Sequence, residues 1–258
     1  MITSTKKAKA RLVSSSLFFL FVWHSLLSPL SLQADTLKLT TVDWQPFFGH
    51  DIPEKGFFSA ITREAFNRAG YDIKIEFQPW KRALETTIKG DYDGLLGAYF
   101  NEARASKLHY SDVVFENQDI FITKRKDLID YQDLNELKAY RIAVMRGAAY
   151  AEELKHKGFN IIENNHELQS LKMLCKGRVD VVLMSKMHFQ YISENDAEIF
   201  SERETLAILK KPFRVYPLYV PITKKRSDSQ EVIDRFNDAL TEIKTDGTYQ
   251  KILGRFGF

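Results

Sequence analysis

A short phrase that occurs twice limits what this chain of 258 residues can fold into. The stretches K-G-D-Y-D at 89–93 and K-G-R-V-D at 176–180 each end a segment with helical spacing of apolar residues and lead into an apolar run. Upstream of each copy, at 37–42 and 140–145, apolar and polar residues alternate and a loop follows. This repetition predicts two lobes of similar strand-and-helix design that face each other across a cleft.

The first 34 residues have the order of a secretory signal peptide. Lysine and arginine residues come first, an apolar run at 17–27 follows, and small Ala34 stands where cleavage is expected. A membrane anchor is the less favoured alternative, because a spanning helix needs about 20 apolar residues and serine, histidine and proline interrupt this run. A lipid anchor would need a cysteine just after the cleavage point, and the single cysteine is Cys175. We therefore expect export to the periplasm with cleavage near Ala34.

The charge balance of the chain changes when the leader is removed. The whole sequence has 37 Lys and Arg against 34 Asp and Glu, and four of the cations but none of the anions lie before Asp35. The remaining 33 cations and 34 anions are nearly balanced, so nothing indicates a nucleic-acid partner. A lone cysteine cannot form an internal disulfide, and Cys175 is interpreted as a small core residue. The exported fold must then be held by its hydrophobic core.

Strand and helix patterns alternate after the leader, which predicts mostly parallel sheets flanked by helices. The expected elements of the first lobe are strands at 35–42, 71–77 and 94–99 and helices at 59–69 and 80–88; those of the second are strands at 141–145, 160–163 and 179–184 and helices at 150–155 and 167–175.

The tail is expected to return to the first lobe, with a strand at 218–223 and helices at 230–244 and 248–258. Lobe 1 would then comprise residues 35–119 and 218–258, and lobe 2 residues 120–217. The charged cluster at 124–127 is the expected surface crossing between them. Two crossings would form a hinge that bends around a ligand.

Taken in order, these segments resemble the periplasmic solute-binding proteins of family 3, which deliver polar amino acids and related solutes to ABC transporters. The resemblance rests on the first strand and aromatic loop at 37–47, the G-x-x-D strand at 90–97, the A-R to Y-S-D segment at 103–112 and D-G-T-Y-Q-K-I at 246–252. It implies the two-lobed type II fold, a small-molecule solute, no cofactor, a monomer, and a membrane partner that is either an ABC permease or a sensor.

Arg104 stands where this family has an arginine that holds the carboxylate of the ligand. A planar guanidinium offers two parallel donors to a carboxylate, and such a pair is strong in a closed, dry cleft. Without the resemblance, Arg104 would be interpreted as a solvated residue of the polar run 101–107.

Aromatic residues follow the predicted strands at the edge where open α/β sheets place their ligand crevice. Trp44 matches a family aromatic that stacks on the solute, and Phe47 lies close behind it; core packing is the alternative for both. Trp80 follows the second strand and would form a second wall or pack at a helix start. Tyr99 stands where the family usually has a threonine that donates to the ligand.

The second lobe is expected to contribute Arg146, Gly147 and Ser185 from across the cleft. The pair Arg146-Gly147 matches a family turn that opens a helix, where backbone N–H groups favour anions, although a plain helix-start glycine is the alternative. Amino-acid binders carry Ser or Thr at the positions of Ala148 and Ala149.

At the position of Ser185 the same relatives carry the aspartate that pairs with the α-ammonium of the ligand. An ammonium desolvated without that partner would cost several kcal/mol. A carboxylate with an aromatic or neutral body is therefore expected, unless Asp43 or Glu64 supplies the missing anion.

Patterns that would indicate an enzyme are missing from the sequence. The six histidines form no H-x-x-x-H or H-E-x-x-H pattern, and no G-x-S-x-G or phosphate loop occurs. We therefore expect a binding protein without catalysis. A ligand-sensing protein that reports to a membrane receptor is the stronger alternative to transport, and a prephenate-type dehydratase on the same fold is the weaker one.

Overall fold

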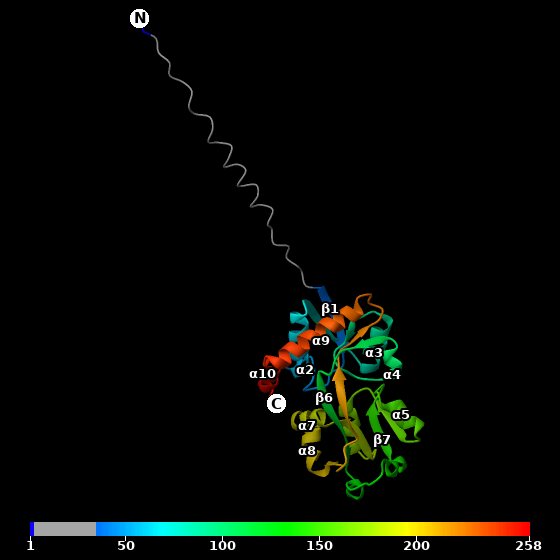
Figure 1. Ribbon diagram of the computed structural model, residues 1–258. Helices are drawn as coiled ribbons and strands as arrows, with labels where there is room; N and C mark the ends of the chain where they lie inside the picture. The colour runs from blue at the N-terminus through cyan, green and yellow to red at the C-terminus, as the bar shows by residue number, and fades with distance from the viewer. Residues whose placement is uncertain (3–34) are drawn as a thin grey trace. The chain divides into compact units, whose positions relative to one another are not determined.

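Two β-sheets form the framework of residues 35–258 in the computed structural model (Figure 1). The structure describes residues 1–2 and 35–258. Apart from its first two residues, the predicted signal peptide lies outside the described residues, as does the cleavage point expected near Ala34.

The first sheet belongs to the lobe that begins at Asp35. In spatial order its strands are β2 (Tyr71–Phe77), β1 (Asp35–Thr41), β3 (Gly94–Leu95), β12 (Pro221–Thr223) and β5 (Leu108–Tyr110). β1 is parallel to β2 and β3, whereas β12 is antiparallel to β3 and β5. β1 buries Leu37 and Leu39 completely, in keeping with its alternating sequence.

Helices from both ends of the chain pack on this sheet. They are α2 (Phe57–Arg68), α3 (Trp80–Lys89), α9 (Ser229–Thr245) and α10 (Thr248–Arg255), with the short η2 (Pro53–Lys55) and α4 (Glu102–Ala105) beside them. α9 contacts α2, β5 and β12, and Figure 1 shows it lying across the first lobe. Its buried stripe of Val232, Phe236, Ala239 and Ile243 has helical spacing. The tail from Pro221 onward thus packs on the first sheet.

The second sheet forms the other lobe. In spatial order its strands are β4 (Ala98–Tyr99), β11 (Arg214–Tyr219), β6 (Phe115–Thr123), β9 (Val181–Ser185), β7 (Arg141–Met145) and β8 (Asn160–Asn164), with β10 (Ala207–Ile208) beside β6. Along β6, Phe121 packs into one hydrophobic core while Ile120 and Ile122 pack into another. The central strands are therefore buried on both faces, as expected for an α/β lobe.

Short helices cover the two faces of this second sheet. They are η3 (Lys126–Leu128), η4 (Leu134–Ala139), α5 (Ala151–His156), α6 (Glu167–Cys175), α7 (Lys186–Asn195), α8 (Ala197–Glu202) and η5 (Arg203–Thr205). The parallel pairs of β7 with β8 and β9 follow the strand–helix–strand repeat, and the antiparallel pairs involve β6 and β11, which carry the chain between lobes. The two-lobed α/β fold is confirmed.

The chain passes between the two sheets at Gly97, between β4 and β5, at residues 111–114 and at Val220, and the crossing expected at 124–127 is wrong. Ser111 and Val220 lie side by side, because the Ser111 N–H donates to the Val220 carbonyl at 3.2 Å and the Val220 N–H donates to Ser111 Oγ at 2.9 Å. The cluster at 124–127 instead follows the end of β6, where Arg125 pairs with Asp127 at the surface. Residues 115–119 thus lie in the second sheet.

Two segments expected as single strands each divide between the two sheets. The segment 94–99 divides at Gly97, and the segment 218–223 divides at Val220. Gly97 has φ +80°, and a Cβ there would lie 2.5 Å from the ring of Phe48, so the bend requires glycine. These divisions bring residues from both sheets to one cleft.

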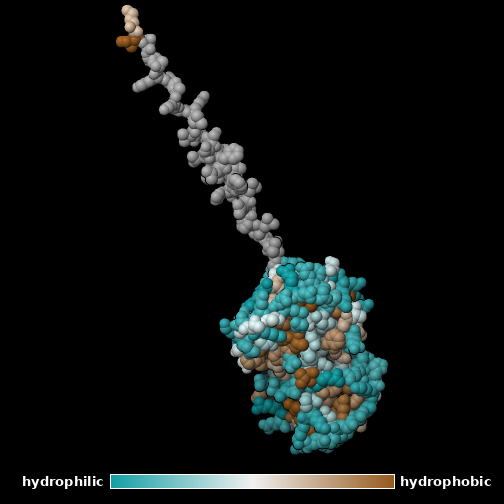
Figure 2. Space-filling view, viewed as in Figure 1, coloured by the Kyte–Doolittle hydropathy of each residue, from teal (hydrophilic) through white to brown (hydrophobic). Residues whose placement is uncertain are grey.

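Hydrophilic residues cover most of the face shown in Figure 2, and hydrophobic residues gather near its middle, where the two lobes meet. Large apolar residues that are exposed within 35–258 are scattered, among them Phe100 and Val215. No helix in the described part of the chain is long and apolar enough to cross a bilayer.

Candidate ligand-binding site

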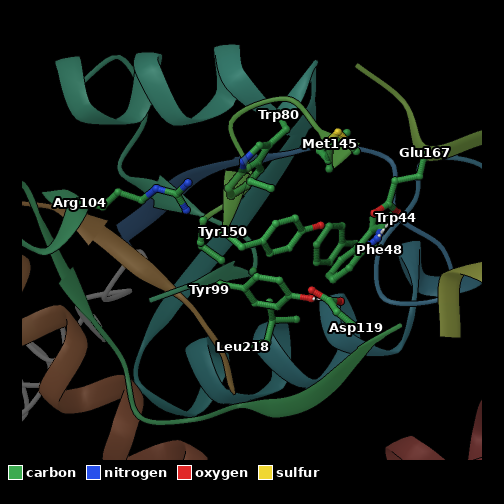
Figure 3. Close-up of a pocket in the computed structure, with 15 residues that line it drawn as sticks. Trp44, Phe48, Trp80, Tyr99, Arg104, Asp119, Met145, Tyr150, Glu167 and Leu218 are labelled. Carbon is green, nitrogen blue, oxygen red and sulfur yellow. Dashed lines mark hydrogen bonds between the residues drawn. The ribbon is translucent and has the colours of Figure 1, made fainter. Parts of the chain in front are cut away.

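A cavity of about 60 Å³ lies between the two lobes. Pockets for small ligands usually measure roughly 300–1,000 Å³, so the two walls of this cleft are nearly closed on each other. Both sheets and the helices beside them line it (Figure 3). The lining residues are Val42, Trp44, Phe48, Trp80, Gly97, Ala98, Tyr99, Arg104, Asp119, Met145, Ala148, Ala149, Tyr150, Glu167 and Leu218.

Arg104 enters the cavity from α4 and is 9% exposed. Asn101 begins this helix, because its side chain accepts the Arg104 N–H at 3.2 Å. The guanidinium Nη2 donates to the carbonyl of Gly147 at 2.6 Å, and the guanidinium carbon Cζ lies 5.8 Å from the centroid of the Trp80 ring. Burial lowers the pKa of Arg104, and no carboxylate of the described residues lies within ion-pair distance of it. The cleft therefore contains a buried cation that is ready to pair with an anion.

The Gly147 carbonyl joins the lobes at this end of the cavity. It accepts from Arg104 and also from the Trp80 Nε1–H at 3.1 Å, although Gly147 itself belongs to the turn after β7. Gly147 has φ +75°, a conformation that favours glycine. The predicted turn is thus at the cleft, where its carbonyl rather than an N–H faces Arg104.

Trp44 forms an aromatic wall that other rings support from behind. Its ring stacks on Phe47 with centroids 4.3 Å apart and an interplanar angle of 16°. Phe47 is completely buried and packs edge-on against Phe115, so it does not line the cavity. The expectation that Phe47 contacts the ligand is corrected: it positions Trp44, and Phe48 lines the cavity instead.

Asp119 is an acidic residue of the cavity that was not expected. It lies on β6 with 1% of its surface exposed, and its Oδ1 accepts from the Tyr99 hydroxyl at 3.0 Å and from Asn117 Nδ2 at 2.8 Å. Its Oδ2 is buried and has no hydrogen-bond partner. Burial raises the pKa of Asp119 from 3.8 to about 7, although the bonds from Tyr99 and Asn117 oppose this shift.

Ser185 lies behind the cavity wall and not on it. It is completely buried, its hydroxyl donates to Asn117 Oδ1 at 2.8 Å, and it accepts the His188 N–H to cap α7. Asn117 in turn holds Tyr99 and Asp119. The expectation that Ser185 contacts the ligand is corrected, since its position in the sheet directs it to this buried network.

Glu167 is the second acidic residue of the cavity and is the first residue of α6. It is 5% exposed, and its Oε2 accepts the Trp44 Nε1–H at 2.9 Å across the cleft. Burial, and then the nearby charge of Asp119, raise its pKa to about 8. The group is therefore mostly protonated at neutral pH while no cation lies beside it.

His188 lies beside Glu167 with its Nε2 3.6 Å from Oε2. Burial lowers the pKa of His188 to about 4, so the ring is neutral at pH 7. Its Nδ1 lies 2.5 Å from the carbonyl of Gln45, and because a carbonyl only accepts, the proton of the neutral ring is on Nδ1. The loop of Trp44 and Gln45 is thereby joined to α6 and α7 of the other lobe.

The remaining candidates from the sequence lie outside the cavity. Arg146 is exposed, with its Nη2 3.5 Å from the Glu163 carbonyl, because the turn at Gly147 directs it outward. Asp43 accepts the backbone N–H of His50, and Glu64 pairs with Arg68 on α2. Neither replaces the missing aspartate.

The expectation of a cleft without an anion is therefore wrong, since Asp119 and Glu167 both line it. For one of these two acids, Glu167, the sequence contained a pattern that could have identified it. Glu167 follows the strand predicted at 160–163, so the rule that identified Trp44 applies to it as well. Asp119 had none, because its place in the cleft depends on where the chain changes sheets.

A nearly closed cavity between two α/β lobes, with a buried cation and two buried carboxyl groups facing it, defines a two-lobed protein that binds a small solute. The sequence profile of the bacterial extracellular solute-binding proteins, family 3, matches residues 39–258. The chain belongs to this family.

Similar proteins bind amino acids. The chain is 24% identical over 213 residues to the L-cystine-binding protein TcyA of Bacillus subtilis, covering 81% of this chain and 76% of TcyA. It is 23% identical over 224 residues to the arginine-binding extracellular protein ArtP of the same organism, covering 83% of this chain and 82% of ArtP.

Solved structures share the fold. A histidine kinase sensor domain with similarity to periplasmic binding proteins matches with a TM-score of 0.75 and 18% identity, covering 86% of this chain and 96% of that one. An ancestral arginine-binding protein bound to arginine matches with a TM-score of 0.71 and 22% identity, covering 88% of this chain and all of that one.

Proposed function

We propose that this protein is an exported receptor that closes on a small, carboxylate-bearing, amino-acid-like solute and presents it to an ABC importer. The observation that carries the proposal is Arg104, a buried guanidinium at the cavity whose partner across the cleft is a backbone carbonyl and not a carboxylate. A solute carboxylate would replace the Gly147 carbonyl and form a charge-assisted, bidentate pair.

Closure is the second part of the proposal. Trp44 and Trp80 in the first lobe donate to Glu167 and to the Gly147 carbonyl in the second, so the cavity walls themselves hold the cleft shut. The paired crossings at Ser111 and Val220 provide a narrow hinge. The solute adds its own contacts to both walls and thereby favours the closed state.

Loss of Arg104 tests this function. Arg104→Ala should weaken the binding of any carboxylate solute by at least about 100-fold, because a charge-assisted bidentate pair in a dry cleft is lost. Arg146→Ala is the matched control, since that arginine is exposed and outside the cavity. Titration calorimetry after a thermal-shift screen of amino acids, dicarboxylates, aromatic acids and small peptides measures the affinities.

The melting temperature distinguishes binding from folding. It should stay nearly unchanged in Arg104→Ala without solute, because Arg104 has no ion pair to lose among the described residues. A large fall would assign Arg104 a structural role, and unchanged affinity would contradict the proposal.

Sensing is the second candidate function. The match to a histidine kinase sensor domain supports it, and the same cleft and hinge would serve. Solute uptake by cells that lack this protein separates the two: a loss of uptake supports transport, whereas unchanged uptake with a lost transcriptional response supports sensing.

Catalysis is the weaker alternative. A neighbouring structure is an ancestral amino-acid-binding protein that is a precursor of cyclohexadienyl dehydratase, and Glu167 is a protonated acid in the cavity. Turnover of prephenate by the purified protein would favour this alternative over simple binding.

A further inference from the structure

In the cavity, the cationic Arg104 and the two acidic residues lie at opposite ends of the Tyr99 side chain. At the backbone end, the Tyr110 hydroxyl donates to the Tyr99 carbonyl at 3.4 Å and also faces the Arg104 guanidinium. At the other end, the Tyr99 hydroxyl donates to Asp119. Figure 3 shows the rings of Tyr99 and Tyr150 between Arg104 on one side and Asp119 and Glu167 on the other. The rings of Tyr99 and Tyr150 therefore separate the cation from the acids.

This separation does not suit the two charges of a simple α-amino acid. Its carboxylate and ammonium are attached to the same carbon, so a ligand whose carboxylate is on Arg104 would hold its α-ammonium close to Arg104. The carboxyl groups that line the cavity, Asp119 and Glu167, lie at the far end. The position where relatives carry the ammonium-binding aspartate is Ser185, which is buried behind the wall.

Asp119 has an unused acceptor that faces this far end. Its Oδ2 is buried without a hydrogen-bond partner, although the side chain lines the cavity. An unpaired buried oxygen is costly, and a ligand N–H donor would satisfy it. Around it, Trp44, Tyr99 and Tyr150 present aromatic rings, which attract a desolvated cation.

We propose that the solute is bipolar, with its carboxylate on Arg104 and an ammonium or guanidinium group at the far end of an apolar chain, bound by Asp119 with Glu167 beside it. An α-ammonium is not required for binding. This inference rests on the proposed function, because it takes the carboxylate on Arg104 as given. The aromatic rings of Tyr99 and Tyr150 enclose the apolar chain between the two ends.

Two isomers that differ only in the position of one amino group test the proposal. 5-Aminopentanoate carries its ammonium at the far end of the chain, whereas 2-aminopentanoate carries it beside the carboxylate, and pentanoate carries none. We expect the purified protein to bind the best of the series from 4-aminobutanoate to 6-aminohexanoate at least about tenfold more tightly than 2-aminopentanoate, as one extra charged hydrogen bond implies. Titration calorimetry at one pH measures all the affinities.

Asp119→Asn keeps the shape of the side chain and removes its charge. It should abolish the preference for the distal isomers while the affinity for pentanoate stays within about twofold. Asp43→Asn is the matched control, since Asp43 lies in the loop after β1 but outside the cavity, and it should keep the preference. If Asp119→Asn does not fold, Glu167→Gln replaces it and should reduce the preference.

The possible results distinguish failure of the bipolar-solute proposal from failure of the proposed function. If pentanoate and 2-aminopentanoate bind in a manner that depends on Arg104 but no distal amino group adds affinity, this inference is overturned and the proposed function stands. A preference that persists in both Asp119→Asn and Glu167→Gln also overturns it. If no acid of this series binds but another carboxylate of the thermal-shift screen does so through Arg104, this inference is overturned and the proposed function stands. If no carboxylate of that screen binds, both fail.

Discussion

Asp119 and Glu167 give the cleft its chemical character at the scale of single residues. Each is at least nine-tenths buried, and neither has an ion pair with a lysine or arginine among the described residues. Burial keeps carboxyl groups of this kind protonated to a higher pH than usual while no cation lies beside them, because their charged form is poorly solvated. Arg104 at the opposite end is charged and lacks an anion. The empty cleft therefore holds unmatched groups that a bipolar solute would pair.

The stability of the empty protein should fall as the pH rises from 6.5 to 8. Burial raises the pKa of Asp119 to about 7 and of Glu167 to about 8, so the folded state holds protons that the unfolded chain has released. Their stabilising contribution is complete below about pH 4 and is lost as the pH rises through those values. The lowered pKa of His188 acts in the opposite direction, but only between about 4 and 6.5.

The other charged or titratable groups facing these carboxyls do not titrate in that window. Burial raises the pKa of Tyr99, Tyr150 and Tyr216 above 10, and the hydrogen bond to Glu153 raises the already high pKa of Arg214. The free energy of unfolding should fall by at most about 1.4 kcal/mol per pH unit for each carboxyl. Urea denaturation of the protein without solute measures it. The same slope in the double variant Asp119→Asn, Glu167→Gln would contradict this account.

Residues of the site could be predicted where a motif or the end of a predicted strand indicated them. Trp44, Trp80 and Tyr99 follow or end predicted strands, and Arg104 lies in a recognisable motif, and all four line the cavity. Phe47 and Ser185 also follow predicted strands, but their side chains are buried in the protein and do not line the cavity. Sequence spacing places a residue at the end of a strand, whereas the direction of its side chain depends on the packing of the whole lobe.

At the scale of helices and strands, regular periodicity predicted the elements that remain within one lobe. β1 and β2 agree with the expected segments within one residue at each end. α3 extends one residue beyond its expected end, to Lys89, and Gly90, with φ +94°, ends the helix. The strands that change sheets were not predicted as such. The apolar runs G-L-L-G-A-Y at 94–99 and L-Y-V-P-I at 218–222 continue through Gly97 and Val220, so nothing local indicates that hydrogen-bond partners change there.

Phe236 on α9 should contribute strongly to the stability of the first lobe. It is completely buried, and its ring lies 4.5 Å from that of Phe66 on α2. Phe236→Ala should lower the free energy of unfolding by about 3–5 kcal/mol, because a large cavity remains in the core. Urea denaturation measures the loss, and Phe100→Ala is the control, since Phe100 is 48% exposed and should cost less than about 1 kcal/mol. Equal effects of the two substitutions would show that α9 is not part of the core.

At the scale of the whole molecule, solute binding depends on closure of two lobes that share only narrow connections. The cross-cleft bonds of Trp44, Trp80, Arg104 and His188 join loops and helix starts. The chain itself passes between the sheets at Gly97, between β4 and β5, at 111–114 and at Val220. Such a molecule can open by bending at those segments while each core stays intact. A solute that bridges Arg104 and Asp119 would add a contact to each side of the cleft.

The crystal structure of the complex with the tightest-binding amino acid of the series tests this account most directly. We expect the lobes to be closed, with the solute carboxylate bidentate on Arg104 in place of the Gly147 carbonyl and the distal amino group within hydrogen-bond distance of Asp119 Oδ2. A carboxylate held elsewhere, with Arg104 still bonded to Gly147, would contradict it.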